Sequence, residues 1–122
     1  MITTLQDILK EYKSDMERME SRIHESLGTD VPLIQQVSKY ILGAGGKRFR
    51  PLLHLLSARL CGYREHNAEY LLGSIVEYIH TASLLHDDVV DEAKIRRGRS
   101  SANSLWGNQA SILVGDYLYS KA

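Results

Sequence analysis

The sequence has a single cysteine, two prolines, one tryptophan and one phenylalanine among its 122 residues. One cysteine, Cys61, allows neither an intramolecular disulfide nor a metal site built from several thiolates. Such sparse cysteine is typical of a reducing compartment, so we expect a cytoplasmic protein. No apolar run reaches the length of a membrane span, and the N-terminal segment lacks the pattern of a secretory signal. We therefore expect neither a transmembrane segment nor a secretory signal.

The chain also lacks an excess of charge of either sign. Fifteen Lys and Arg residues balance fifteen Asp and Glu residues, so no overall field attracts nucleic acid or an anionic membrane surface. The basic run from Arg96 to Arg99 has no aromatic residues between its arginines, whereas binders of single-stranded nucleic acid use aromatic stacking platforms. We expect no nucleic-acid partner, and any electrostatic function must be local.

Strands are a further absence, because no segment alternates apolar and polar residues beside a hairpin turn. Apolar residues instead recur every three or four positions between Leu5 and Leu27, which predicts an amphipathic helix that ends at Gly28. The composition, 43% hydrophobic and 25% charged, fits one globular domain. The sequence therefore predicts an all-α fold.

The two prolines mark the starts of further helices. Pro32 suits the first turn of a helix that runs to Gly43, because proline fixes the backbone as a helix start requires. Pro51 suits the first turn of the next helix, which ends near Gly62. The segment between these helices is rich in glycine and basic residues, so it does not continue either of them.

A mostly apolar segment, residues 68–93, follows Asn67, which can cap a helix. Apolar residues cover most of its helical circumference, and this predicts a buried central helix. The polar segment 94–103 predicts a loop, and helical spacing resumes over 103–122. The polar residues of the central helix are then the candidates for chemistry.

The sequence HDDVVD lies near the end of this helix. Asp87 and Asp91 are four residues apart, so they share a face and lie about 5.4 Å apart along the axis. Two such carboxylates repel unless a cation lies between them or the helix end opens to water. Mg²⁺ suits the first case, since it takes one or two carboxylates, several waters and phosphate oxygens. Asp88 points elsewhere and suits a supporting role, and a solvated acidic helix terminus is the alternative interpretation.

The segment GGKRFRP, residues 45–51, combines glycines with basic side chains. Glycines let the backbone approach an anion, Lys47 supplies a point charge, and arginines such as Arg50 supply planar donors. The helix that starts near Pro51 adds a favourable dipole. Together these features suit a diphosphate, while an ordinary basic surface loop is the alternative. No Walker A pattern supports a nucleotide site.

Two further groups could belong to the same site. His80 lies two helical turns before Asp87 on the same face, with Ser83 between them. Arg96 and Arg97 follow the last aspartate of the motif and could either bind phosphates or neutralise the acids. A hydrogen-bonded core histidine remains the alternative for His80.

The ordered combination of GGKRFRP and HTASLLHDDVVDEAKIRRG resembles the trans-isoprenyl diphosphate synthase family, and within it the bacterial long-chain polyprenyl diphosphate synthases. The resemblance implies a helical bundle of the isoprenoid synthase type. It also implies a prenyltransferase that condenses isopentenyl diphosphate with an allylic diphosphate, such as farnesyl diphosphate, with Mg²⁺ as cofactor. A homodimer is implied too, and Leu113 and Leu118 of the last helix are candidates for its contact.

The resemblance also implies roles for individual residues. Four basic residues would hold isopentenyl diphosphate: Lys47, Arg50, His80 and Arg97. Asp87 and Asp91 would bind Mg²⁺, and Arg96 would contact the allylic diphosphate in the catalytic step. The growing chain would pass beside the central helix, where Ala82 and Ser83 are small. Small residues there imply a long-chain product.

Family members are much longer and carry a second aspartate-rich motif, which has no counterpart in this sequence. We therefore expect residues 1–122 to be the N-terminal part of a single polyprenyl synthase domain, inactive by themselves. Two alternatives stay open. A class I terpene cyclase fragment would have no use for GGKRFRP and His80. A non-catalytic helical partner subunit of a two-component synthase would have no use for paired carboxylates facing a basic loop.

Overall fold

The computed structural model describes residues 1, 4–44, 46–63 and 67–122. These parts form seven helices and one short hairpin. The predicted all-α fold is therefore confirmed, with the hairpin as an addition. Gly45 of the glycine-rich segment lies outside the described residues.

The N-terminal segment forms two helices where the apolar spacing predicted one. α1 (Leu5–Glu11) and α2 (Lys13–Glu25) meet at Tyr12, whose ψ of 17° interrupts the helical backbone. α2 ends at Glu25, before the predicted stop at Gly28, and Ser26 is the residue that caps its C-terminus. The prediction of one continuous helix was wrong because the apolar spacing continues across the break without any residue that favours an interruption.

The next two helices flank the glycine-rich segment. α3 (Pro32–Leu42) has Pro32 in its first turn, as predicted. α4 (Phe49–Leu60) begins two residues before Pro51, so this proline is the third residue of the helix rather than the first. Arg48 precedes α4 with a left-handed backbone, φ 50° and ψ 36°, which non-glycine residues seldom adopt.

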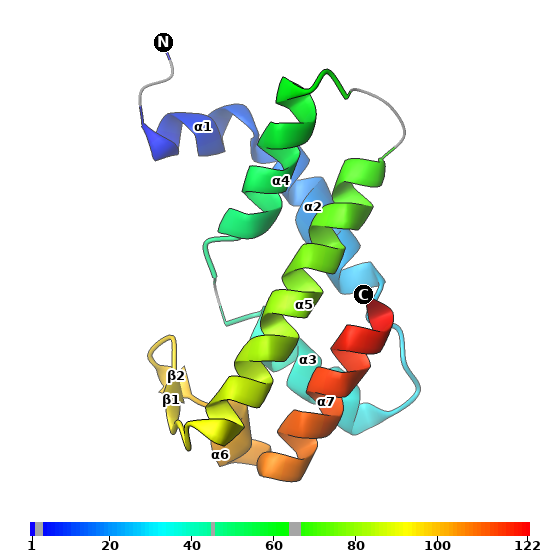
Figure 1. Ribbon diagram of the computed structural model, residues 1–122, viewed down its shortest axis with the longest axis vertical. Coiled ribbons are helices and arrows are strands. Elements are labelled where there is room, and N and C mark those ends of the chain that lie inside the picture. The colour runs from blue at the N-terminus through cyan, green and yellow to red at the C-terminus, as the bar shows by residue number, and fades with distance from the viewer. Residues whose placement is uncertain (2–3, 45, 64–66) are drawn as a thin grey trace.

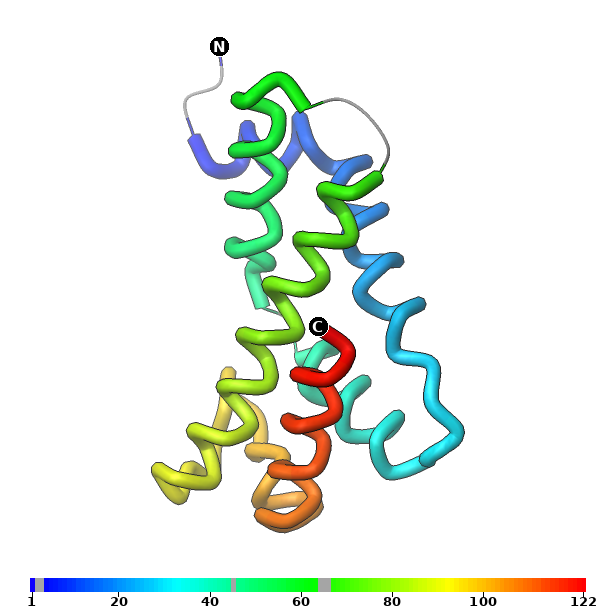
Figure 2. Tube along the Cα trace, turned by 45° about the vertical axis from the view of Figure 1, so that its right-hand side comes forward, coloured from blue at the N-terminus to red at the C-terminus, as the bar shows by residue number. Residues whose placement is uncertain are grey.

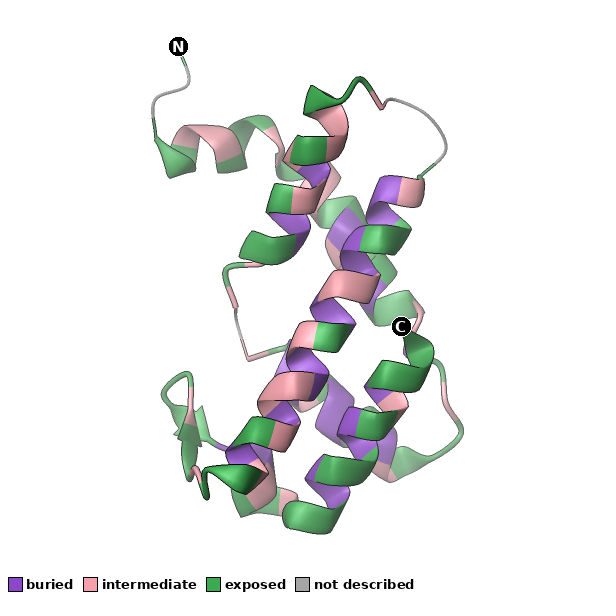
Figure 3. Cartoon of the chain, viewed as in Figure 1, coloured by how far each residue is buried: buried purple, intermediate pink, exposed green. Residues whose placement is uncertain are grey.

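α5 (Ala68–Val90) is the central helix, and it packs against α2, α4, α6 and α7 (Figure 1). Buried positions recur along its whole length (Figure 3), which confirms the predicted burial. Gly73 lies so close to α2 that an added methyl group would overlap the Met19 side chain. Asn67 precedes the helix as predicted, although its side chain makes no capping hydrogen bond.

The segment after α5 is a hairpin where a loop was predicted over 94–103. β1 (Ile95–Arg96) and β2 (Arg99–Ser100) are antiparallel. Arg97 and Gly98 form the turn, with φ values of 52° and 74°, the signs that a two-residue type I′ turn requires. The loop prediction was wrong here because strands of two residues are too short to show any alternation.

The last segment is divided by Gly107, whose φ is 87°. α6 (Ala102–Trp106) precedes it and α7 (Asn108–Lys121) follows. Leu118 is fully buried in the core of this chain, so it is not available for the contact between two chains that was expected of it. Leu113 is half exposed and stays available.

The core lies between α5 and the helices around it (Figure 2). One tyrosine of this core, Tyr78, donates a hydrogen bond from its hydroxyl group to the carbonyl oxygen of Ile23. None of the described helices has a stretch long and apolar enough to cross a membrane. The largest buried apolar side chains come from five helices: Met19, Ile23, Val37, Ile41, Leu42, Leu52, Leu55, Tyr78, Leu85, Val114 and Leu118.

Candidate functional site

The acidic pair lies at the C-terminal end of α5. Asp91 is the residue that ends the helix, and its N–H donates to the carbonyl oxygen of Asp87 at 2.8 Å. Both side chains are exposed. The parts of the chain that the structure describes contain no group of three or more His, Cys, Asp or Glu side chains that could hold a metal ion. Two carboxylates are nevertheless the set that Mg²⁺ completes with water and phosphate oxygens.

Asp88, between these two, is buried and paired with Arg96 from β1. Arg96 Nε donates to Asp88 Oδ2 at 3.1 Å, and Nη2 donates to Oδ1 at 2.5 Å. This two-pronged hydrogen bond raises the pKa of Arg96. Asn103 Nδ2 donates to the carbonyl oxygen of Ala93 at 3.0 Å. The end of α5 is thus tied to the hairpin and to α6.

Arg50 and His80 meet between α4 and α5. Arg50 Nη1 lies 3.1 Å from His80 Nε2. Burial lowers the pKa of the His80 imidazole, and the positive charge of Arg50 lowers it further. The imidazole is therefore neutral near pH 7, and its Nε2 can accept a hydrogen bond from Arg50. Ser83 Oγ donates to the carbonyl oxygen of His80 at 2.6 Å.

Arg97, at the tip of the hairpin, reaches the glycine-rich segment. A methyl group added at Gly46 would come within 2.8 Å of Arg97 Nη1, so the guanidinium lies directly against this backbone. Burial lowers the pKa of Arg97, and the charges of Arg48, Arg96 and Arg50 lower it too, although Glu77 opposes them. The hairpin and residues 46–48, which precede α4, lie on the same side of α5 (Figure 1).

The cations at this place differ from the arginines that are paired with carboxylates. Within the described residues, Lys47, Arg50 and Arg97 have no carboxylate at ion-pair distance, whereas Arg48, Arg59 and Arg96 each have at least one. Lys47 is exposed beside Gly46. Positive groups gathered without counter-ions favour a multiply charged anion, because it relieves their mutual repulsion.

No role was predicted for Arg48 from the sequence, although this residue is at the centre of the segment. Its guanidinium donates to Glu20 of α2, to Glu77 of α5 and to the carbonyl oxygen of Leu42. One signal was available in the sequence. Glu77 stands on the apolar central helix, and a buried carboxylate needs a hydrogen-bonded cation.

The two small residues of α5 have different surroundings. Ala82 is fully buried in the core of the chain. Ser83 is only partly buried and lies one turn after His80, on the side of the helix that faces Arg50. Of the two predicted product-length positions, Ser83 is the one that is open to a neighbouring ligand.

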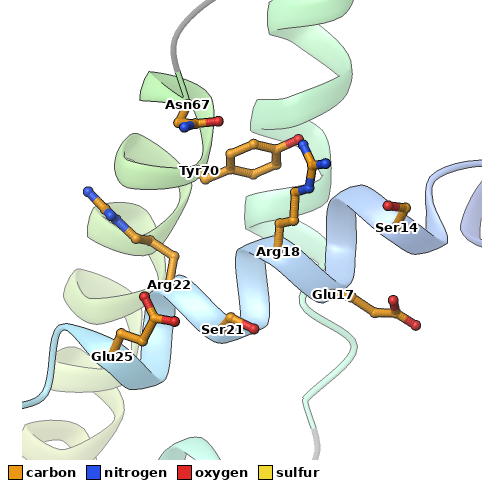
Figure 4. Close-up of a pocket in the computed structure, with 8 residues that line it drawn as sticks. All are labelled: Ser14, Glu17, Arg18, Ser21, Arg22, Glu25, Asn67 and Tyr70. Carbon is orange, nitrogen blue, oxygen red and sulfur yellow. The ribbon is translucent and has the colours of Figure 1, made fainter.

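A prominent surface hollow among the described residues is elsewhere. It is an open groove of ≈ 680 Å³ between α2 and the start of α5 (Figure 4). Tyr70 in this groove precedes Asp87 by 17 residues on α5, which is about 25 Å along the helix axis. None of the predicted site residues lines it. Its lining is polar: Ser14, Glu17, Arg18, Ser21, Arg22, Glu25, Asn67 and Tyr70.

Comparison with known proteins identifies the family. The polyprenyl synthetase family model matches residues 31–122. The chain belongs to this family. The matched range contains all the residues for which the sequence analysis predicted a role in the site. Those residues are Lys47, Arg50, His80, Ala82, Ser83, Asp87, Asp91, Arg96 and Arg97.

Curated relatives of this chain include long-chain synthases. The chain is 51% identical over 108 residues to octaprenyl diphosphate synthase of Escherichia coli (strain K12), covering 88% of this chain and 33% of that protein. It is 46% identical over 117 residues to the geranyl-diphosphate specific all-trans-nonaprenyl-diphosphate synthase of Rhodobacter capsulatus, covering 96% of this chain and 36% of that protein. The chain thus spans about a third of the length of these relatives.

Solved structures of the family share the fold. A decaprenyl diphosphate synthase from Rhodobacter capsulatus superimposes with a TM-score of 0.89 at 45% identity, over 95% of this chain and 36% of that one. A polyprenyl synthase from Caulobacter crescentus CB15, complexed with calcium and isoprenyl diphosphate, superimposes with a TM-score of 0.91 at 38% identity. That match covers 97% of this chain and 36% of the other.

Proposed function

We propose that this chain is the substrate-binding part of a prenyltransferase that makes long-chain all-trans polyprenyl diphosphates. The observation that carries the proposal is the cluster of Arg50, His80 and Arg97. These residues come from three separate elements, and none of them has a carboxylate at ion-pair distance in the described part of the chain. Such a cluster suits the diphosphate of isopentenyl diphosphate, which carries several negative charges. Lys47 is exposed beside it and adds a further cation.

The second substrate is proposed to bind at the end of α5. Asp87 and Asp91 would hold Mg²⁺ there, since two exposed carboxylates one turn apart fit its ligand preference. When bound, Mg²⁺ would neutralise charge on the departing diphosphate. The calcium and isoprenyl diphosphate of the Caulobacter crescentus polyprenyl synthase support a site for both types of ligand.

Arg96 is proposed to contact the allylic diphosphate. In this structure its guanidinium is oriented by the buried Asp88, and its side chain is still 29% exposed. A guanidinium has five N–H donors, and Asp88 accepts from two of its nitrogens. The remaining donors are free to bind phosphate oxygens while Asp88 keeps the group in place.

The proposed reaction joins isopentenyl diphosphate to the prenyl chain of the allylic diphosphate. The bond between C1 of the allylic substrate and its diphosphate oxygen breaks, and the diphosphate leaves with the electron pair. The alkene of isopentenyl diphosphate attacks the allylic cation and forms the new carbon–carbon bond, and loss of a proton restores an alkene. The cations of this chain would hold the two diphosphates at the distance and in the orientation that the reaction requires. This lowers the entropic part of the activation barrier. Arg96 would stabilise the charge that develops on the leaving group.

We further propose that residues 1–122 form the N-terminal part of one synthase domain, which works as a homodimer. The polyprenyl synthetase match and the coverage of about a third of each relative support the first proposal. A cytoplasmic location stays a prediction from the single cysteine.

The test is an intact-mass measurement on the protein from its native source, together with an elongation assay. The assay contains isopentenyl diphosphate, farnesyl diphosphate and Mg²⁺, and its products are analysed for length. We expect metal-dependent formation of long-chain polyprenyl diphosphates. A preparation without elongation under these conditions would contradict the proposal. A native mass of 13.8 kDa, with activity only after a partner chain is added, would instead support the two-component subunit.

A further inference from the structure

Arg48 has an unusual backbone at the point where the basic segment meets α4. Its φ of 50° and ψ of 36° lie in the left-handed region, which is unfavourable for a residue with a Cβ atom. Such a conformation persists only where the surrounding structure holds it. The contacts of the Arg48 side chain stabilise this backbone conformation.

The guanidinium of Arg48 is almost fully buried among acceptors from three helices. Nε and Nη2 each donate to the Glu20 carboxylate at 2.8 Å, and Nη1 donates to Glu77 Oε1 at 3.0 Å. Nη2 also donates to the carbonyl oxygen of Leu42 at 2.6 Å. Only 9% of the Arg48 side chain and 4% of the Glu77 side chain is exposed. One side chain therefore joins the basic segment to α2, α3 and α5.

The neighbours of Arg48 are the residues that form the cationic cluster. Gly46 lies against the guanidinium of Arg97, and Arg50, two residues after Arg48, contacts His80. His80 is one turn after Glu77 on α5. The carboxylate that accepts from Arg48 and the imidazole that contacts Arg50 thus belong to one rigid stretch of helix.

We propose that Arg48 is a positioning residue, which holds the segment 46–50 against α5 so that Arg50, His80 and Arg97 converge on one diphosphate. It does not itself contact the ligand, because four of its five N–H donors are used by Glu20, Glu77 and the end of α3 and because its side chain is buried. This inference rests on the proposed function, which supplies the identity of the ligand as isopentenyl diphosphate.

The other end of α4 offers a matched control. Arg59 bridges the same two helices, with Nη2 donating to Asp15 of α2 at 3.0 Å and Nη1 donating to Glu69 of α5 at 2.9 Å. Its side chain is 17% exposed. None of the predicted site residues contacts it. Removal of either arginine breaks one ion pair to α2 and one ion pair to α5. Only Arg48, however, is next to the cationic cluster.

The experiment compares Arg48→Met with Arg59→Met in the full native protein. Melting temperature, kcat and the KM values for isopentenyl and allylic diphosphates are measured. We expect both variants to melt at lower temperature than the wild type. Only Arg48→Met should raise the KM for isopentenyl diphosphate, by about ten- to a hundredfold. In this variant the segment 46–50 is no longer held against α5, so the cationic groups that bind the diphosphate are misplaced. The KM for the allylic diphosphate should change little, and Arg48→Lys should restore part of the loss.

Equal changes of this KM in the two variants would overturn the proposal, since they would show a purely structural role for Arg48. If Arg48→Met does not fold, Glu20→Gln weakens the same contact by placing an amide N–H₂ against the guanidinium. Glu20 is 41% exposed and tolerates the change. The same KM change is expected of this variant, and an unchanged KM overturns the proposal.

Failure of the proposed function is recognised separately, because the wild type would then not elongate prenyl chains. In that case the positioning role of Arg48 can still be tested by measuring the affinity of the protein for inorganic diphosphate by calorimetry. The affinity should fall about tenfold or more in Arg48→Met and stay close to wild type in Arg59→Met. Equal affinities in these two variants would overturn the inference.

Discussion

At the scale of single residues, the site combines a neutral imidazole with permanently charged guanidinium groups. Arg50 and Arg97 keep the pKa of His80 below its usual value, after the larger effect of burial. A diphosphate bound between them would act in the opposite direction, because an anion favours the protonated imidazole. His80 is therefore the one member of the cluster whose charge can respond to the ligand at neutral pH.

The lowered pKa of His80 predicts a dependence of stability on pH. The unfolded chain, with the ordinary value near 6.5, binds more protons than the folded chain in the range between the two pKa values. The free energy of unfolding therefore falls as the pH drops below about 6.5. In His80→Gln this contribution is absent, so urea unfolding at pH 7 and pH 5 should show a smaller difference than in the wild type. An equal difference in both proteins would contradict the assignment.

The metal assignment makes a second prediction for a single residue. Asp87→Ala removes one of two proposed Mg²⁺ ligands, and elongation activity in the full native protein should be abolished. Asp30→Ala, at an exposed acid between α2 and α3, should leave activity unchanged. Elongation is measured as incorporation of labelled isopentenyl diphosphate into extractable product. Retained activity in Asp87→Ala would remove the basis for a metal site at the end of α5.

The position of Asp87 and Asp91 at the end of the central helix followed from the sequence, because it depends only on helix geometry. Their role as metal ligands stays a prediction. Sequence patterns could not give the partner of Arg96. A run of aspartates followed by arginines allows many pairings, and burial selects Asp88 among them. Arg48 was missed for the same reason, since its acceptors Glu20 and Glu77 are distant in the sequence.

At the scale of secondary structure, the sequence predicted helices more reliably than their ends. The start of α3 at Pro32 and the position before α5 at Asn67 followed from residue preferences that act locally. The break at Tyr12 has no such local cause. Gly107 did offer a signal, because glycine readily adopts the positive φ that separates α6 from α7.

Tertiary contacts stabilise the hairpin, whose two-residue strands give only a weak signal in the sequence. Arg99 stacks over the ring of Tyr40 at 4.0 Å, and the Tyr40 hydroxyl donates to the carbonyl oxygen of Ser100 at 2.7 Å. Trp106 packs edge-on against the same ring, with the centroids 5.0 Å apart. Two-residue strands have little stability of their own, so these contacts from α3 and α6 support the hairpin that carries Arg97.

The two small residues of α5 lead to a prediction about product length. Ser83→Phe places a ring on the partly open face beside His80 and should shorten the polyprenyl product. Ala82→Phe, one residue away, overfills the core and should instead lower stability by about 1–3 kcal/mol. Product length by chromatography and melting temperature distinguish the two effects. An unchanged product length in Ser83→Phe would contradict a chain path along this face.

At the scale of the whole molecule, exposed apolar side chains are numerous for a chain of this size. They include residues of α4, α5 and α7 that do not face the core, and apolar surface of this kind favours association. Half-exposed examples are Phe49, Leu53, Ile79, Ile112, Leu113 and Tyr119.

The proposed homodimer can be tested on α7. Leu113→Asp places a charge on the half-exposed apolar face and should lower the fraction of dimer, measured as molar mass by light scattering. Leu60→Asp is the control, because Leu60 is 89% exposed on another helix and contributes little to any packed surface. Equal dissociation in both variants, or none in either, would place the dimer contact elsewhere.

The uninterrupted course of α5 has a consequence for how this protein can change during evolution. His80 and Asp87 lie on the same helix, about 10.5 Å apart along its axis. Insertion or deletion of one residue between them would turn one relative to the other by about 100°. A change of length within the stretch 80–87 would therefore separate the two parts of the site, even where a single residue of the stretch can be replaced. We expect variation in length to be confined to segments outside the helix, such as the connection between α2 and α3.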